Sequence, residues 1–419
     1  MCLKRSMALV ATAAAFVAPI HGSPASLTDP DSTHVSSLQS RQDSRCGTGF
    51  GKSCDPGYCC SSAGWCGQGY LYCSAPACQI NYGPACDANR RPQGPDTRNV
   101  ARPKLGSVPY GKPIYRCTRP GDIALTFDDG PFDYTEDLLD KLANLSCTSP
   151  AYDAKATFFI TGNNLGKGMV NDPDYPWPSL LQRMIDEGHQ IAGHTWSHQR
   201  LTDLSESQFL NQMHYLETAM ADLFGFFPTY MRPPYSACNA TCEALLDTLG
   251  YHITYFNLDT EGYLRNSPEE IAQSKAIWDA HVEGANPATQ SWLHIEHDPV
   301  YHAVYSLTDH MLESLVRNGF RAVTVGTCLE DPPENWYRSV SDCGPPQFPP
   351  TTDGRCGPNH GHQTCAFEPL DMTCCSWANW CGSTAAHCEV IEVDRPSPVK
   401  PRTEYLVYTS HSPILAPTS

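Results

Sequence analysis

Short apolar runs alternate with longer amphipathic stretches through the middle of the chain, from Gly121 to Val325. Seven of the short runs have the length of buried strands: Ile123–Phe127, Ala156–Thr161, Gln190–Gly193, Thr229–Arg232, His252–Asn257, Ser291–Ile295 and Ala322–Val325. Six longer stretches have helical character: Glu136–Leu145, Ser179–Glu187, Glu206–Phe224, Cys242–Leu249, Glu269–Val282 and Thr308–Asn318. Capping signals, for example Ser205 followed by Gln208, mark several helix starts. This alternation predicts an α/β fold with a distorted (β/α) barrel, in which chemistry gathers at the carboxyl ends of the strands.

Cysteine density divides the rest of the chain into modules and joins. Of the 21 cysteines, eight lie in residues 46–86 and six in residues 356–388. Both dense segments contain the block Cys-Cys-Ser-x-x-x-Trp-Cys-Gly, so one module occurs twice. A module of about 40 residues is too small to bury a conventional core and needs disulfides. The proline-rich joins 87–108 and 344–355 predict extended, semi-rigid spacers on either side of a central domain, 109–343.

The two ends of the chain predict export. Two basic residues precede the apolar run from Met7 to Ile20, the pattern of a cleaved secretory signal over residues 1–22, with a buried first helix as the alternative. Residues 23–45 are then a linker or propeptide, and residues 389–419 a tail rich in Pro, Ser and Thr. Clustered cysteines favour an oxidising compartment. No later stretch reaches the roughly 18 apolar residues of a membrane span, so we expect a secreted, soluble, extracellular protein.

Composition excludes one class of function. Hydrophobic residues make up 41% of the chain, which is enough for a sizeable core. Lys and Arg number 28 against 45 Asp and Glu, a net charge of −17 with His neutral. A polyanion of this kind has no electrostatic attraction to nucleic-acid phosphates or to an anionic membrane surface. We therefore expect neither nucleic acid nor membrane among its partners.

Five polar clusters follow predicted strands. They are Thr126-Phe127-Asp128-Asp129-Gly130-Pro131, His194-Thr195-Trp196-Ser197-His198, Arg232-Pro233-Pro234-Tyr235, Asp259, and Ile295-Glu296-His297-Asp298. Each alone has an ordinary explanation, because Asp-Gly is a strong turn former and a histidine pair can simply face solvent. Two histidines at i and i+4, in a helical backbone, can face one metal, and with one carboxylate they leave positions open for water. Because all five clusters follow successive predicted strands, we interpret them as residues of a chemical site and not as ordinary turns.

In this order, the clusters resemble the motifs of the polysaccharide deacetylase family, carbohydrate esterase family 4 or the NodB-homology domain. The ending Ala322–Gly326 and Pro333–Tyr337 looks like that of the fungal chitin deacetylases. The resemblance implies a metal-dependent N-deacetylase. It also implies that Asp129, His194 and His198 hold the metal, usually zinc, with Co²⁺ or another divalent metal as alternatives.

The same resemblance implies a role for each remaining motif residue. Asp128 would be the general base and His297 the general acid. Arg232 would orient Asp128, Asp259 would hold His297 in its working tautomer, and the Tyr235 amide would donate to the oxyanion. One departure from the family is the bulky Glu296, which we expect to alter a sugar subsite.

Each cysteine-rich module resembles the hevein-like chitin-binding module. For the first, this implies the disulfides Cys46–Cys60, Cys54–Cys66, Cys59–Cys73 and Cys78–Cys86; for the second, Cys356–Cys375, Cys365–Cys381 and Cys374–Cys388. It also implies sugar contacts by Ser61, Trp65 and Tyr72, and by Ser376 and Trp380. His387 replaces the second module's tyrosine, which predicts weaker binding there. The alternative is that these aromatic side chains only pack a small core.

Family resemblance also pairs Cys117 with Cys328 and Cys238 with Cys242. Cys147 and Cys343 remain, and two sequons offer glycan sites at Asn144 and Asn239. The complete hypothesis is a secreted, monomeric chitin deacetylase that releases acetate from N-acetylglucosamine units and is held on chitin by its modules. Two alternatives stay open: an acetylxylan-type esterase of the same family, and a catalytically inert chitin-binding lectin.

Overall fold

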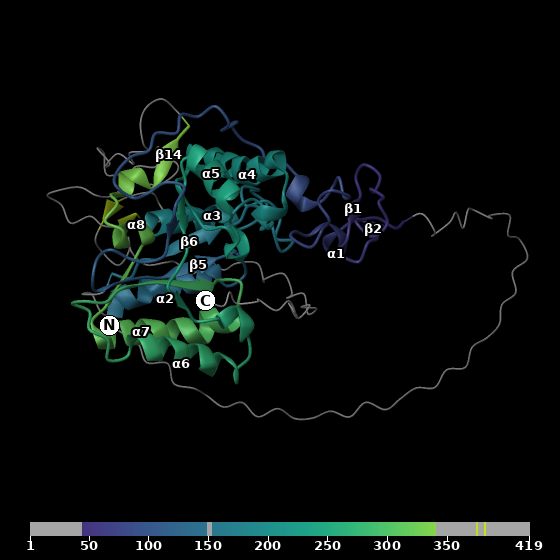
Figure 1. The fold of residues 1–419 in the computed structure, drawn as a ribbon. Coiled ribbons are helices and arrows are strands. Elements are labelled where there is room, and N and C mark those ends of the chain that lie inside the picture. The colour runs from purple at the N-terminus through teal and green to yellow at the C-terminus, as the bar shows by residue number, and fades with distance from the viewer. Residues whose placement is uncertain (1–43, 149–152, 341–373, 376–380, 383–419) are drawn as a thin grey trace, which may run out of the picture. The chain divides into compact units, whose positions relative to one another are not determined.

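The computed structural model describes residues 44–148, 153–340, 374–375 and 381–382, and the predicted signal segment and tail lie outside them. A parallel sheet of ten strands occupies the centre of the described chain, in the order β13-β4-β12-β5-β6-β7-β9-β10-β3, with β11 paired to β12 (Figure 1). Its strands are β3 (Pro113–Ile114), β4 (Asp122–Ala124), β5 (Thr126–Asp128), β6 (Thr157–Ile160), β7 (Gln190–Gly193), β9 (Tyr230–Met231), β10 (His252–Thr254), β11 (Leu258–Asp259), β12 (Trp292–His297) and β13 (Arg321–Val323). The predicted parallel α/β domain is confirmed.

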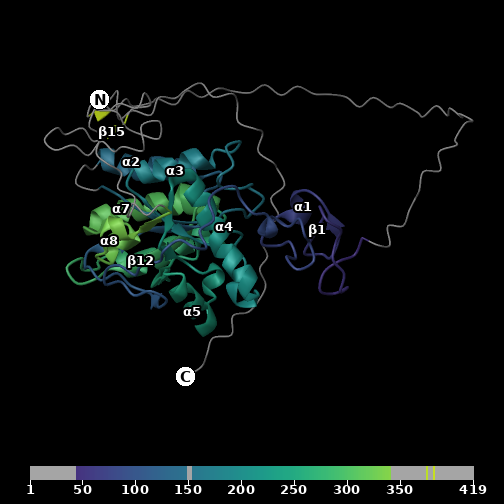
Figure 2. The same ribbon diagram turned by 90° about the horizontal axis from the view of Figure 1, so that it is seen from above.

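Helices surround the central strands, as the two perpendicular views show (Figures 1 and 2). They are α2 (Thr135–Thr148), α3 (Trp177–Asp186), α4 (Glu206–Phe224), α5 (Ala240–Thr248), α6 (Ile271–Val282), α7 (Thr308–Asn318) and the short α8 (Val325–Cys328). Single turns form η2 (Leu201–Asp203), η3 (Pro234–Ser236), η4 (Gly262–Leu264), η5 (Ala303–Leu307) and η6 (Pro333–Asn335). Helix α4 has the predicted capping box at Ser205 and Gln208 and ends at the left-handed Gly225. Among the described residues, no helix has the length and apolarity needed to span a bilayer.

The segment between β10 and β11 closes the barrel. The amide of Tyr255 donates to the carbonyl of Ile114 on β3 (2.7 Å), and two residues later the amide of Asn257 donates to Leu293 on β12 (3.0 Å). One extended segment therefore joins the two sides of the sheet. Strands β3 and β11 are only two residues long, which is too short for periodicity to reveal. An antiparallel pair, β8 (Phe226–Pro228) with β14 (Tyr337–Ser339), was likewise not predicted.

The first module is built around disulfides. It contains β1 (Cys59–Cys60), β2 (Cys66–Gly67), α1 (Tyr70–Cys73) and η1 (Asp87–Asn89). Its bridges are Cys46–Cys60, Cys54–Cys66, Cys59–Cys73 and Cys78–Cys86, the pairs that the resemblance implied. The central domain holds Cys117–Cys328 and Cys238–Cys242. Half-cystines fill most of the module's interior, as its small size requires.

The repeat extends to the described part of the second module. Strand β15 (Cys374–Cys375) pairs antiparallel with β16 (Cys381–Gly382), so that Cys374 faces Gly382. In the first module Cys59 faces Gly67 in the same register. The three implied bridges of the second module, its contact residues Ser376, Trp380 and His387, and any pairing of Cys147 with Cys343 lie outside the described residues.

The first proline-rich join packs against the central domain, unlike the predicted spacer. Thr97 is fully buried and donates to Glu217 on α4 (2.6 Å), and Arg102 pairs with the same carboxylate at 2.8 Å. A Cβ at Gly94 would lie 2.6 Å from the carbonyl of Thr218, so the chain lies directly on α4 there. Hydrogen-bonding side chains between the prolines, rather than proline content, determine this path.

Glu217 is the most heavily hydrogen-bonded carboxylate of this contact. It also accepts from His214 (2.9 Å) and from the hydroxyl of Tyr251 (2.7 Å). Burial alone would raise its pKa, but the hydrogen bonds from His214 and Arg102 outweigh burial and lower the pKa from 4.5 to about 2. Because the folded-state pKa is depressed, this stabilisation is complete above pH 4.5 and is lost as the pH falls toward 2.

We therefore predict that Glu217→Gln lowers the free energy of unfolding at pH 7 by about 3 kcal/mol, and that its stability falls less steeply than that of the native chain between about pH 5 and 2. Denaturant unfolding at several pH values would measure both effects. Glu283→Gln is the control and should change stability far less, since water and salt screen the exposed Glu283–Arg317 pair. Equal losses in the two variants would contradict the prediction.

Candidate active site

The polar motifs meet at the carboxyl ends of parallel strands. Asp128 ends β5 and faces His297, the last residue of β12. His194 follows β7, and Arg232 follows the neighbouring β9, where its amide donates to Gly193 (2.9 Å). Since parallel strands present their carboxyl ends at one edge, residues up to about 170 positions apart in sequence become neighbours.

Left-handed backbone conformations gather at this edge. Asp129 (φ 77°), His198 (φ 55°) and Tyr235 (φ 59°) all occupy the region that normally favours glycine. Thr195 (φ 70°) lies in the histidine motif, so this motif is a turn and not the helix that i, i+4 spacing requires. Such positions cost about 1–3 kcal/mol each and persist where the surroundings fix them, commonly at functional sites.

Asp129, His194 and His198 converge. Asp129 Oδ1 lies 3.6 Å from His194 Nε2 and 3.3 Å from His198 Nε2, and the three candidate ligand atoms lie within 4.8 Å of one another. His194 Nδ1 donates to the carbonyl of Arg232 (2.7 Å), which leaves the Nε2 lone pair directed toward Asp129. Asp129 Oδ1 is buried and accepts no hydrogen bond from the described residues. Two imidazoles and one carboxylate in this arrangement fit a divalent cation.

The protonation states also suit ligands. Burial, followed by the nearby His198, lowers the pKa of His194 to about 3, so this ring is neutral. Burial would raise the pKa of Asp129, but His198 and His194 outweigh it and lower the pKa below 3.8. An ionised carboxylate beside a neutral imidazole is the state in which both groups bind metals.

Asp128 is held by a buried arginine. Arg232 donates to Asp128 Oδ1 at 2.6 Å and to Thr126 at 2.7 Å, and its guanidinium lies 4.1 Å from the centre of the Phe159 ring. Burial raises the pKa of Asp128 from 3.8 to about 7, although Arg232 opposes this shift. A carboxyl group with a pKa near neutrality is well matched to accepting a proton.

His297 and Asp259 do not make the expected contact. Asp259 accepts instead from the amide of Glu261 (2.8 Å) and from the hydroxyl of Tyr263 (3.2 Å). Within the described chain, Nδ1 of His297 has no hydrogen-bond partner. Glu261 is left-handed (φ 55°), so the chain turns back and its amide reaches the carboxylate first. Burial lowers the pKa of His297 to about 4.

Two buried groups lie beside the turn that carries Asp129: Lys167, which sequence reasoning missed, and Asp298, which belongs to the fifth cluster but was given no role. Lys167 donates to the carbonyl of Gly130 (2.8 Å) and to Thr161 (2.9 Å), and burial lowers the pKa of this lysine to about 7. Asp298 packs so closely on Gly130 that a Cβ there would lie 1.9 Å from its carboxylate. Both groups fix the turn that carries Asp129. Lys167 lies in a loop without a recognisable motif, so no local signal marked it.

Glu296 is bonded within the protein. It neighbours His297 on β12, and successive side chains of a strand point to opposite faces. The Glu296 carboxylate is fully buried and accepts hydrogen bonds from Thr260 and from the amide of Gly262. The expectation of an altered sugar subsite stays a prediction.

Comparison with known proteins agrees with this geometry. The model of the polysaccharide deacetylase family matches residues 115–254. A chitin deacetylase from Colletotrichum lindemuthianum is 41% identical over 232 residues, which are 55% of this chain and 89% of that protein. One from Pestalotiopsis sp is 38% identical over 299 residues, 70% of this chain and 92% of that protein. The chain belongs to the polysaccharide deacetylase family.

A solved structure gives the same result. The chitin deacetylase from the fungal pathogen Colletotrichum lindemuthianum aligns with a TM-score of 0.51 and 41% identity, covering 55% of this chain and 97% of that one. This polysaccharide deacetylase is accordingly an enzyme with a parallel α/β catalytic domain, and a divalent metal fits its Asp129, His194 and His198.

Two neighbours frame the histidine turn, residues 194–198, of this deacetylase. Tyr235 is 48% exposed, and its ring lies 4.6 Å from the His198 ring and 4.8 Å from the Arg200 guanidinium. Trp196, between the two histidines, is fully buried and donates to the carbonyl of Asp87 at the end of the first module (3.1 Å). The turn therefore presents its histidines on one side and an anchoring side chain on the other.

The predicted sugar contacts of the first module differ in exposure. Trp65 is 40% exposed, and its amide donates to the hydroxyl of the buried Ser61 (3.2 Å). The Tyr72 ring is half-buried and packs against Gly67. Arg45, which sequence reasoning missed, places its guanidinium 4.2 Å from the Trp65 ring. An exposed indole in so small a module favours recognition over packing.

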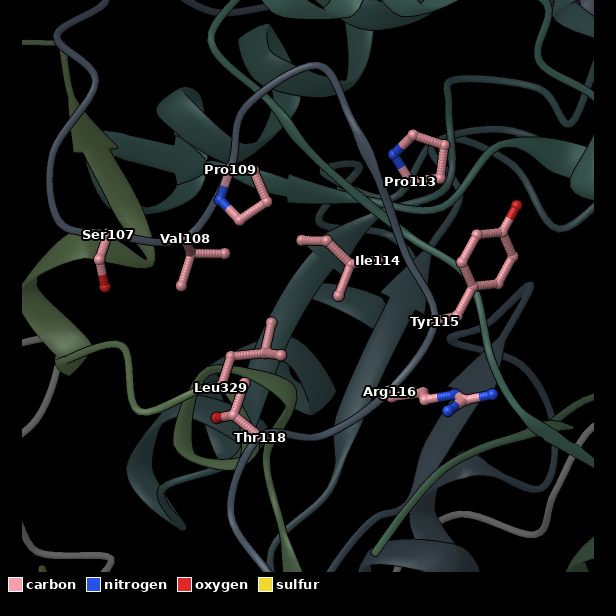
Figure 3. A pocket seen from close by; sticks show the side chains of 9 residues that line it. All are labelled: Ser107, Val108, Pro109, Pro113, Ile114, Tyr115, Arg116, Thr118 and Leu329. Atoms are coloured by element: carbon pink, nitrogen blue, oxygen red, sulfur yellow. The ribbon is translucent and has the colours of Figure 1, made fainter.

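A pocket of about 450 Å³ beside β3 is separate from the catalytic motifs (Figure 3). Its lining is mainly apolar and consists of Ser107, Val108, Pro109, Pro113, Ile114, Tyr115, Arg116, Thr118 and Leu329. None of the carboxylates or histidines described above contributes to it.

We predict that Asp129→Asn weakens Zn²⁺ and Co²⁺ binding at least about 100-fold, because it removes the ligand charge that the two imidazoles face. Asp128→Asn is the matched control and should change affinity less than about tenfold, since Asp128 is bonded to Arg232 instead. Competition with a chromophoric chelator on metal-stripped protein measures both affinities. Similar losses of metal affinity in the two variants would show that Asp129 contributes no more to metal binding than Asp128 does.

Proposed function

We propose that this polysaccharide deacetylase hydrolyses the acetamido groups of N-acetylglucosamine units in chitin, giving chitosan and acetate. The proposal rests mainly on the convergence of Asp129, His194 and His198 beside the buried Asp128. The names of both similar fungal proteins give the substrate class. Repeated cysteine-rich modules that resemble chitin-binding modules point to the same polymer.

Amide hydrolysis requires an activated water, a stabilised oxyanion and a protonated leaving group. Asp129, His194 and His198 would hold a divalent cation, which we propose to be zinc and which would act as a Lewis acid that polarises the carbonyl and lowers the pKa of water. Asp128 takes the proton from water, and Arg232 keeps its Oδ1 in place. His297 gives a proton to the departing sugar nitrogen, and the Tyr235 amide donates to the oxyanion.

Binding and catalysis would be divided between the domains. Trp65 and Tyr72 offer aromatic faces for the apolar side of a pyranose ring, and the hydroxyl of Ser61 lies beside Trp65. We propose the same role for Ser376 and Trp380. The disulfide-rich chain would act outside the cell as a monomer, with glycans at Asn144 and at the exposed Asn239.

Acetate release tests the proposed reaction. With zinc, the enzyme should release acetate from chitin oligomers in preference to acetylated xylan, and a chelator should abolish turnover. Asp128→Asn should lower kcat by about 10²–10⁴-fold while retaining metal. Preference for xylan would favour the esterase alternative. Absence of turnover on either polymer would favour the inert lectin.

The module is tested separately by chitin pull-down. Trp65→Ala should weaken retention of the full chain on chitin by about 5-fold or more, because stacking of an aromatic ring on a sugar is lost. Tyr58→Ala is the matched control, since Tyr58 is a similarly exposed aromatic residue of the same module without a proposed contact. If the Trp65 variant is retained on chitin as well as the native chain, the indole serves only in packing and does not bind chitin.

A further inference from the structure

Glu296 is a fully buried carboxylate that the proposed reaction does not use. It lies on β12 with its side chain on the face opposite to that of His297. Its Oε1 accepts hydrogen bonds from the hydroxyl of Thr260 and from the amide of Gly262 (3.0 Å). The hydroxyl of Thr260 also contacts Nε2 of His294 at 2.8 Å. Glu296 therefore ties β12 to residues 259–264, the loop that follows β11.

The backbone of this loop packs tightly against the Glu296 carboxylate. A Cβ on Gly262 would lie 2.5 Å from Glu296 Oε2, so the backbone rests directly on the carboxylate. Glu261, one residue earlier, has the left-handed conformation that makes the chain turn. Without an acceptor at Glu296, the buried amide of Gly262 would lose its partner, which costs about 1–3 kcal/mol, and the hydroxyl of Thr260 would keep only its contacts with His294 and Ile295. Glu296 thus contributes to the path of the loop.

The loop carries two side chains to the catalytic edge. Tyr263 donates to Asp259 (3.2 Å), and its ring meets the His297 ring edge-on, with centres 4.9 Å apart and planes at 63°. His297 Nδ1 has no hydrogen-bond partner in the described chain. Packing against Tyr263, rather than a hydrogen bond at Nδ1, therefore restrains the orientation of the imidazole.

We propose that Glu296 is a positioning residue for the general acid. By anchoring the loop 259–264 it holds Tyr263 against His297, so that the imidazole points at the leaving nitrogen. The inference rests on the proposed function, in which His297 supplies a proton that an amide needs. It assigns to Glu296 a role in one step only, protonation of the leaving group.

The test compares two leaving groups. In chitin oligomers the departing amine must be protonated, whereas 4-nitrophenyl acetate releases a phenolate that needs no acid. Glu296→Ala should lower kcat for the oligomer at least about 10-fold and leave ester turnover within about threefold. Glu296→Gln should restore most of the amide activity, because its amide oxygen can still accept from Thr260 and Gly262. His297→Ala should show the same split between substrates, and adding Glu296→Ala to it should cause little further loss.

Other outcomes would overturn the inference. An equal loss on both substrates would mean that Glu296 only stabilises the fold, and an unchanged amide rate would mean that the loop is positioned without it. If Glu296→Ala does not fold, Tyr263→Ala, at a 44% exposed position, replaces it and should give the same split. A native enzyme that fails on chitin oligomers would instead contradict the proposed function, so the two failures are distinguishable.

Discussion

The buried pair of Arg232 and Asp128 is the interaction on which the catalytic edge depends. Arg232 is 1% exposed and donates to Asp128 on β5 and to the carbonyls of Thr254 (3.2 Å) and Tyr255 (3.0 Å) at the end of β10. Its own carbonyl accepts from His194. Removing either partner from such a pair leaves an uncompensated buried charge, at a cost of about 3–5 kcal/mol. Strand positions and the tautomer of His194 are therefore fixed by the same residue.

Charge balance explains why this edge can hold a cation. Two buried carboxyl groups, Asp128 and Asp298, and the partly exposed Asp129 face two buried basic side chains within the described part of the chain, Arg232 and Lys167. Burial raises the pKa of both Asp128 and Asp298 to about 7, although Arg232 and Lys167 oppose these shifts. Asp129 stays ionised because His198 and His194 surround it. A divalent ion at Asp129 would supply the missing positive charge where the negative charge is most persistent.

Local sequence patterns predicted the strands of the sheet and the residues at their ends. The seven strand runs correspond to strands of the sheet, because buried parallel strands are apolar throughout. The ends of these runs were sufficient to predict that Asp128, His194 and His297 share one edge of the sheet. Two of the missed contacts join distant segments, Thr97 with Glu217 and Lys167 with Gly130. The third is local, because Asp259 accepts hydrogen bonds from its own turn. No periodicity marks a polar side chain that is buried because another segment satisfies it.

The proposed base and the proposed acid are held by different interactions, and the difference suits the role proposed for each. Asp128 is fixed by an ion pair, and an adjacent cation keeps a base able to release its proton after turnover. In the proposed reaction His297 is protonated and deprotonated in each cycle, and a carboxylate at Nδ1 would favour its charged form and retain the proton. Contact with the neutral ring of Tyr263 orients the imidazole without that penalty, and burial keeps its pKa low. Because Asp259 is bonded to Tyr263 and not to the imidazole, no carboxylate among the described residues holds a proton on Nδ1 of His297.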